Sequence, residues 1–320
     1  MCTEKCLELA QGTGRQAGVG GVRGTAGVVP RSIGGVRGTA GGVPRGAGVS
    51  RRVALVGGAA AVATAALGGT AEAVERGHGS PERGHGFPGR GRRHGLVDLT
   101  HPLTTTFPAF VPGEEARRRT FRTIEVDGYY MQEWTIVEHI GTHLDAPGHF
   151  VPGGRLAPEL RPAELVVEAV VIDIAGRAAR DPDTVVTVDD LRAFERRHGR
   201  IPRNAAVLMD SGWAAKVGDP AAYRNPDAAD TLHFPGFGAE ACEWLLRRRG
   251  IRSLGVDTLS LDPGNSTTFD VHLLLAEADR YGLENLNNLD RIPKRGATIF
   301  VGLIPYEEGS GGQARILASW

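Results

Sequence analysis

The chain has 320 residues, enough for one large domain or two small ones, and its formal net charge is zero. This balance conceals a division, because residues 1–95 carry a net charge of +8 and residues 96–320 carry −8. An acidic body argues against a nucleic-acid partner. Three cysteines in the whole chain are too few for a disulfide framework.

The first fifty residues form a glycine-rich repeat. The segment from Gly20 to Arg31 recurs nearly unchanged from Gly34 to Arg45. A repeat of this composition cannot build a hydrophobic core. We therefore expect residues 1–49 to be disordered, or to precede the true start of translation.

Residues 50–73 have the three parts of a twin-arginine export signal. Ser50-Arg51-Arg52 precedes an uncharged stretch from Val53 to Ala71, and Ala71-Glu72-Ala73 supplies a cleavage site. We therefore expect a secreted protein, cleavage after Ala73 and a disordered linker over 74–95. The uncharged stretch is also long enough to span a bilayer, so a membrane anchor at residues 53–71 is the alternative.

In residues 96–320 strand patterns and helix patterns alternate. The expected strands are Leu96–Leu103, Phe121–Val126, Tyr130–Ile140, Leu165–Ile174, Ala206–Met209, Leu254–Val256, Thr298–Leu303 and Arg315–Ala318. The expected helices are Val188–His198, Ala239–Arg249 and Phe269–Tyr281. Because strands outnumber helices and their order is mixed, we predict one α/β domain around a mixed sheet with barrel character.

The run from His139 to His149 places three histidines and the carboxylate of Asp145 within eleven residues. Imidazole and carboxylate together suit zinc or manganese better than calcium or magnesium. A flat strand would hold His139 and His143 about 13 Å apart, at roughly 3.3 Å per residue, which is too far for one ion. Gly141 allows the chain to bend between them. The run therefore predicts a metal site.

His272 and Glu284 are two further candidates for this site. His272 lies in the first turn of an expected helix among apolar residues, and Glu284 lies in an apolar and amide-rich turn. Taken alone, a histidine in such a place is more typical of the core, and the carboxylate could be an ordinary capping residue. The residues by themselves do not show that either side chain reaches the first cluster.

Residues 96–320 resemble the metal-dependent cyclase family, which includes bacterial kynurenine formamidases and isatin hydrolases. The resemblance is carried first by His139-x-Gly-Thr-His143-x-Asp145-Ala-Pro-x-His149. It extends through Asp98–Leu103, Asp210–Trp213, His233–Gly236, Gly255–Gly264, Glu284–Leu289 and Gly311–Ala318. The resemblance implies an α/β fold built around a mixed sheet with barrel character, usually assembled as a homodimer.

Position by position, the resemblance implies that His139, His143 and Asp145 hold one metal ion. Asp145 would bridge to a second ion, which His272 and Glu284 would complete. His149 would remain off the metals as the proton shuttle. The carboxylate of Glu284 is similar to the formamidase pattern, which favours two zinc ions, whereas members with an amide at this position are associated with a single manganese ion.

The implied activity is hydrolysis of a small-molecule amide by metal-activated water, with a histidine proton shuttle. The substrate class would be an aryl formamide, a cyclic imide or amide, or a lactone-like compound. Five aromatic residues could line its pocket, although core packing would explain each of them equally well: Phe107, Phe110, Trp134, Trp213 and Phe237.

Two alternatives belong to other classes of protein. His143-x-Asp145 with a distant His272 also fits the metal triad of non-haem iron oxygenases. In that case His139 and His149 would be surplus. A secreted metal-binding protein without catalysis is the other alternative.

Overall fold

The computed structural model describes residues 95–320, so the predictions made for 1–49, 50–73 and, apart from Gly95, 74–95 lie outside the described residues. The strands are β1 (Leu96–Asp98), β2 (Arg117–Arg122), β3 (Met131–Thr135), β4 (His143–Asp145), β5 (Val166–Asp173), β6 (Val185–Val186), β7 (Ala206–Asp210), β8 (Gly236–Phe237), β9 (Ser253–Val256), β10 (Tyr281–Glu284), β11 (Arg295–Leu303) and β12 (Gly311–Ser319). The helices are α2 (Ile124–Asp127), α3 (Ala175–Ala178), α4 (Val188–His198), α5 (Pro220–Arg224), α6 (Ala239–Arg249) and α7 (Asp270–Glu277). Short 3-10 helices are η1 (Pro147–His149), η2 (Ala157–Glu159), η3 (Pro162–Glu164), η4 (Trp213–Lys216) and η5 (Leu289–Arg291).

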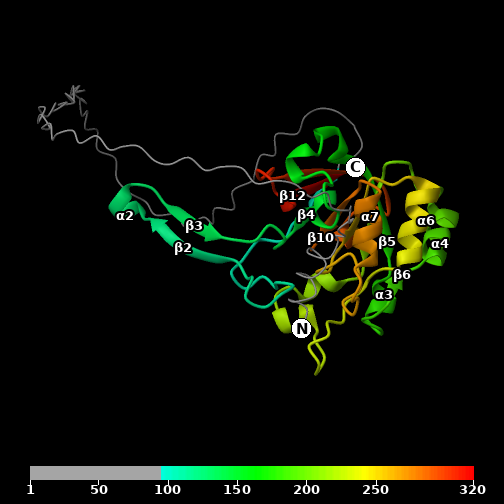
Figure 1. The fold of residues 1–320 in the computed structure, drawn as a ribbon, viewed down its shortest axis with the longest axis horizontal. Helices are drawn as coiled ribbons and strands as arrows, with labels where there is room; N and C mark the ends of the chain where they lie inside the picture. Colours follow the sequence, from blue (N-terminus) through cyan, green and yellow to red (C-terminus); the bar gives the residue numbers. More distant parts are fainter. Residues whose placement is uncertain (1–94) are drawn as a thin grey trace, which may run out of the picture. The chain divides into compact units, whose positions relative to one another are not determined.

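The main sheet closes on itself. Its strand order is β1-β12-β11-β5-β7-β9-β10-β4, and β4 pairs a second time with β12. Seven strands therefore form a ring, while β1 lies beside the far end of β12. Neighbours from β5 to β10 are parallel, and the remaining pairs are antiparallel. The predicted mixed sheet with barrel character is confirmed (Figure 1).

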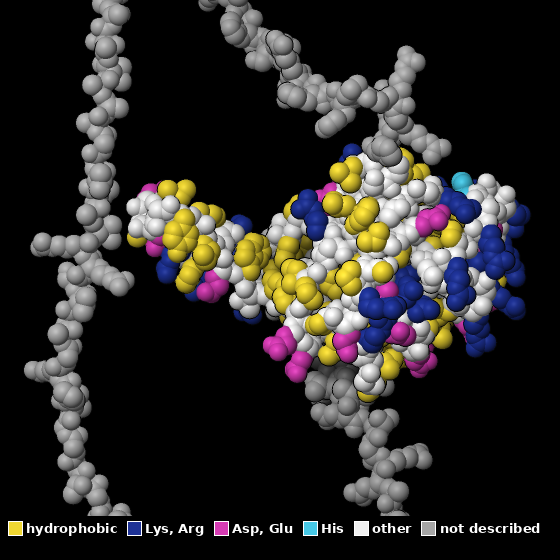
Figure 2. Space-filling view, turned by 90° about the horizontal axis from the view of Figure 1, so that it is seen from above, with side chains coloured by type: hydrophobic (Ala, Val, Ile, Leu, Met, Phe, Trp, Pro, Cys, Tyr) yellow, Lys and Arg dark blue, Asp and Glu magenta, His cyan; other side chains and the backbone are white. Residues whose placement is uncertain are grey.

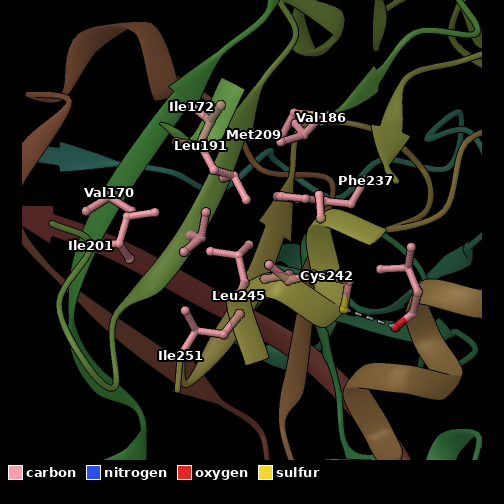
Figure 3. Packing of buried hydrophobic residues seen from close by; sticks show 14 of the residues in the cluster. Val170, Ile172, Val186, Leu191, Ile201, Met209, Phe237, Cys242, Leu245 and Ile251 are labelled. Atoms are coloured by element: carbon pink, nitrogen blue, oxygen red, sulfur yellow. Dashed lines mark hydrogen bonds between the residues drawn. The ribbon is translucent and has the colours of Figure 1, made fainter. Parts of the chain in front are cut away.

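The apolar run of β5 serves two hydrophobic cores. Val167, Ala169 and Val171 belong to the cluster that fills the barrel, whereas Val170 and Ile172 belong to the cluster under the helices. Figure 3 shows the second cluster, in which side chains of the sheet meet those of α4 and α6. A strand buried on both faces is expected to be continuously apolar rather than alternating.

Helices α4 and α6 have the predicted boundaries because their end signals are local. Thr187 caps α4 by accepting the backbone N–H of Asp190 at 3.3 Å, and the Asp190 carboxylate accepts the Thr187 N–H at 2.8 Å. Gly250 ends α6 in the left-handed conformation, with φ 64°. No helix in residues 95–320 combines the length and the apolar character needed to cross a membrane.

The third predicted helix was wrong at its end. Helix α7 stops at Glu277, and Tyr281–Glu284 forms strand β10 instead of a helix end and a turn. Pairing with β9 on one side and β4 on the other fixes this segment as a strand. Gly282 suits the packing, because a Cβ there would lie 2.7 Å from Leu261 Cδ1.

Two predicted strands, Phe121–Val126 and Tyr130–Ile140, have other bounds in the structure. Strands β2 and β3 pair only with each other as a two-stranded sheet. Most of the residues expected to form the rest of the first of these strands form α2, at the tip of the hairpin. This hairpin extends away from the main sheet (Figure 1), and Figure 2 shows hydrophobic side chains gathered along it. Residues Ile136–Ile140, expected as strand, are a connection that leads into the candidate site.

Candidate metal centre

The six predicted site residues come from five neighbouring parts of the fold. His139 lies in the connection before β4, which carries His143 and Asp145, and His149 ends η1. His272 is on α7, and Glu284 is the last residue of β10. Strands β4 and β10 are antiparallel neighbours, with Glu284 opposite His143. Ring closure at β4 thus brings residues from distant parts of the sequence together.

The chain bends at Gly141, as expected. Gly141 has a φ of 73°, and only the three residues of β4 are extended, so the histidine run is not one strand. The bend returns the ring of His139 to β4, where its Nδ1 lies 2.6 Å from Asp145 Oδ1.

The imidazoles and carboxylates meet around Asp145. His143 Nε2 lies 3.2 Å from Asp145 Oδ1 and 3.4 Å from Glu284 Oε2. His272 Nε2 lies 3.0 Å from Glu284 Oε1 and 3.6 Å from Asp145 Oδ2. Two sets of potential ligands share Asp145: one with His139 and His149, the other with His143 and Glu284. Asp145 therefore has the position of a bridging carboxylate, but these sets differ from the predicted grouping, because the first includes His149 and the second joins His143 with Glu284.

Two buried atoms of this cluster support the presence of a cation. Within residues 95–320, His143 Nε2 and Asp145 Oδ2 have no hydrogen-bond partner. The Nδ1–H of His143 donates to the carbonyl of Gly141 at 2.8 Å, which leaves the Nε2 lone pair facing the carboxylates. Buried polar atoms are rarely left unpaired, and a divalent ion would satisfy both of these. The nitrogen and oxygen donor set fits zinc or manganese.

His272 is held by a residue that the sequence did not single out. Its Nδ1–H donates to Asp262 Oδ2 at 2.6 Å, and Asp262 also accepts the backbone N–H groups of Val271 and His272, at 2.9 and 3.1 Å. This leaves Nε2 of His272 facing Glu284. The only sequence signal for Asp262 was its place in the motif Gly255–Gly264, because its partner is on another element.

The charges of the cluster compensate one another. Burial alone would lower the pKa of His143, but the neighbouring carboxylates, Asp145 first, raise it to about 9. Burial and the charge of Asp145 both raise the pKa of Glu284. Burial likewise favours neutral Asp145, yet the surrounding imidazoles, His143 first, hold its pKa well below the usual range. Such a cluster needs a cation, either protons on the imidazoles or a metal ion.

His149 lies at the open edge of the cluster. The residue is exposed, but its ring stacks on His139, with ring centroids 3.8 Å apart and planes at 20°. Desolvation of the ring lowers the pKa of His149 to about 3, and the charge of Asp145 opposes this only in part. The structure places His149 within reach of the ligands; whether it is a ligand or a proton shuttle stays a prediction.

Aromatic rings border the cluster on the side of α7. Phe150 stacks on His272 with centroids 4.6 Å apart, and Phe269 lies 5.6 Å from Phe150. Phe269 has a φ of 53°, a conformation that bulky residues rarely adopt and that often marks functional sites. Of the aromatic residues named from sequence, Phe110 contacts Phe269, whereas Phe107, Trp213 and Phe237 are buried in hydrophobic clusters.

Comparison with known proteins identifies this arrangement. The family model described as "Putative cyclase" matches residues 97–263. Isatin hydrolase of Roseibium aggregatum is 33% identical over 199 residues, covering 59% of this chain and 75% of the relative. Kynurenine formamidase of Erythrobacter litoralis is 26% identical over 224 residues, covering 69% of this chain and 92% of the relative. The structure of isatin hydrolase A from Ralstonia solanacearum superposes with a TM-score of 0.67 at 37% identity, covering 71% of this chain and 92% of that one.

The mixed sheet is closed, and histidines and carboxylates gather where β4 closes it. Together with these relatives, this arrangement defines a metal-dependent hydrolase. The chain belongs to the putative cyclase family. The family, the fold class and the hydrolase class predicted from the sequence are confirmed.

Removal of a proposed metal ligand should weaken metal binding. We expect zinc to raise the thermal unfolding midpoint of the metal-free protein, because a ligand that binds only the folded state stabilises it. In His143→Ala the affinity for zinc should fall at least 10–100-fold. His198→Ala, at an exposed histidine on α4, is the matched control. Equal zinc affinity of the His143 variant and the control would remove His143 from the ligand set.

Proposed function

We propose that this protein hydrolyses the amide bond of a small aromatic substrate, in the manner suggested by its isatin hydrolase and kynurenine formamidase relatives. One observation carries the proposal: two buried carboxylates and three imidazoles converge beside an exposed histidine and two phenylalanines. Family membership favours this activity over a non-haem iron oxygenase or a non-catalytic metal-binding protein, and the oxygenase triad would leave His139 and Glu284 without a role.

His139, His143 and Asp145 would hold one divalent ion, and Asp145, His272 and Glu284 a second. An ion bound here supplies Lewis acidity, polarising the carbonyl of the substrate and making a water molecule easier to deprotonate. We propose zinc, with manganese as the alternative. Two observations support two ions. Asp145 Oδ1 faces His139 Nδ1 and His143 Nε2, while its Oδ2 faces His272 Nε2. Position 284 is a carboxylate rather than an amide.

His149 would move the protons of the reaction. A neutral imidazole can accept a proton from the attacking water, and its ordinary pKa of about 6.5 lets it both accept and donate. It would then return that proton to the nitrogen that leaves when the C–N bond breaks. Stacking against His139 restricts the orientation of the ring, and exposure gives it access to a substrate.

Phe150 and Phe269 would bind the aromatic part of the substrate. Both rings lie on the side of His272, and together with Phe110 they form a continuous series of ring contacts. Offset or edge-to-face stacking of an aryl group on such rings would hold its carbonyl near the ligands. This supports an aryl formamide or an aryl-fused cyclic amide over an aliphatic substrate. A lactone-like ester of similar shape would have the same carbonyl to present.

We further propose that two copies associate through the β2–β3 hairpin. Its exposed apolar residues include Ile124 at 65% exposure, Val126 at 85% and Tyr130 at 59%. A cluster of exposed apolar side chains of this kind is typical of a protein–protein interface. Light scattering on the purified protein distinguishes a dimer of this chain from a monomer.

The purified full chain, loaded with zinc or manganese, tests the activity directly. It should release acid from N-formylkynurenine, isatin or small cyclic amides, and a chelator should abolish the reaction. In His149→Ala turnover should fall about 10²–10⁴-fold, the usual contribution of a general acid–base group, while bound metal is unchanged. Loss of metal together with activity would make His149 a ligand. No hydrolysis of any aryl amide by the metal-loaded protein would contradict the proposed function.

We propose that residues 50–73, which lie outside the described residues, direct export of the protein by the twin-arginine route. Its support is Ser50-Arg51-Arg52 followed by the uncharged stretch and Ala71-Glu72-Ala73. Exported protein should begin at Val74 by N-terminal sequencing, and Arg51→Lys combined with Arg52→Lys should retain the chain in the cell. Protein that stays in the membrane fraction with residues 53–71 intact would support the anchor instead.

A further inference from the structure

We propose that Ser310 and Glu138 are positioning residues that make His139 bind its metal ion through Nδ1, whereas His143 and His272 bind through Nε2. The inference rests on the proposed function, and it concerns how the first ligand of the histidine run is oriented. Neither Ser310 nor Glu138 was identified from the sequence as part of the site, because the two are far apart along the chain.

A chain of hydrogen bonds fixes which nitrogen of His139 carries a proton. Glu138 Oε2 accepts both the hydroxyl of Ser310, at 2.7 Å, and its backbone N–H, at 2.9 Å. A carboxylate can only accept, so the Ser310 hydroxyl proton is directed toward Glu138. Ser310 Oγ must then accept from His139 Nε2, which lies 2.9 Å away. With a proton on Nε2, His139 directs Nδ1 at the cluster, where it lies 2.6 Å from Asp145 Oδ1, and Nδ1 is the ring nitrogen left for an ion.

The other two histidines have the opposite orientation. The Nδ1–H of His143 donates to the backbone carbonyl of Gly141, and the Nδ1–H of His272 donates to Asp262. Each of these rings therefore presents Nε2. The hydrogen bond made by the second ring nitrogen commonly sets the tautomer and orientation of a metal-binding histidine. Here a serine relay, a carbonyl and a carboxylate perform that role for three different rings.

The segment that carries Ser310 is built around the His139 ring. At Gly311 a Cβ atom would lie 2.5 Å from Cε1 of His139, so only glycine leaves space for the ring. Gln313 Nε2 donates to the carbonyls of Val137 and Glu138, at 2.8 and 3.1 Å, which ties the connection before β4 to strand β12. These contacts give a function to the motif Gly311–Ala318, which the proposed reaction does not otherwise use.

The relay also reaches the proposed proton shuttle. His149 stacks on the ring whose orientation Ser310 determines. Loss of the serine hydroxyl should therefore free the His139 ring to rotate, weakening the ion that His139 helps to hold and loosening the support of His149. The ion held by His272 and Glu284 should be affected less, because Asp262 fixes His272 independently.

Ser310→Ala tests this inference, because it removes the hydroxyl while the backbone N–H that bonds Glu138 remains. Zinc would be titrated into the metal-free full chain against a chromophoric chelator, and the protonated nitrogen of His139 would be read from long-range ¹H–¹⁵N NMR of the zinc-loaded protein. In Ser310→Ala the affinity of one zinc site should fall about 10–100-fold, the usual effect of removing a group that orients a ligand. In the wild type the proton of His139 should be found on Nε2.

Ser310→Thr, which keeps the hydroxyl, and Ser319→Ala, at the far end of β12, are the matched controls and should bind zinc as the wild type does. The unfolding midpoint of metal-free Ser310→Ala should match that of the wild type, which separates positioning from a loss of fold. Unchanged zinc affinity in Ser310→Ala, or a proton on Nδ1 of His139 in the zinc-loaded wild type, would overturn the inference while leaving the proposed function intact. Failure of the wild type itself to bind zinc or manganese would overturn both.

Discussion

The structure depends on the mutual compensation of two buried carboxylates, Asp145 and Glu284, by the imidazoles around them. Burying one uncompensated carboxylate costs several kcal/mol, and two close together add their repulsion. Such a pair persists only where hydrogen-bond donors or positive charge compensate it, and the rings of His139, His143 and His272 approach it from three parts of the chain. A divalent ion compensates the pair better, because it satisfies the lone pairs that protons leave unpaired.

Each imidazole is oriented by a different kind of partner, and this diversity follows from where each ring lies. His143 is next to a backbone turn and uses a carbonyl, whereas His272 begins a helix whose N–H groups and ring share one carboxylate. His139 lies in a connection without regular structure and depends on Ser310, the residue directly before strand β12. The ligands alone describe only half of the centre.

The sequence predicted those features whose causes are local. The boundaries of α4 and α6 follow from caps and glycines within a few residues, and the histidine run with its bend at Gly141 lies in one short segment. Strands β4 and β10 were missed because they are short and are defined by their neighbours in the ring. Asp262 and Ser310 were missed for a related reason: each acts on a histidine that only the folded chain brings near.

Strand β4 has three residues, and it is the only pairing partner that joins β10 to β12 in the described ring. Two of those residues are proposed ligands, so the seam of the barrel and the metal centre are the same piece of chain. An ion bound there would hold the sheet closed as well as take part in the reaction. If β4 separated from its neighbours, β10 and β12 would each present an unpaired edge, and other chains can add strands to such an edge. Metal supply would then govern the solubility of the protein as well as its activity.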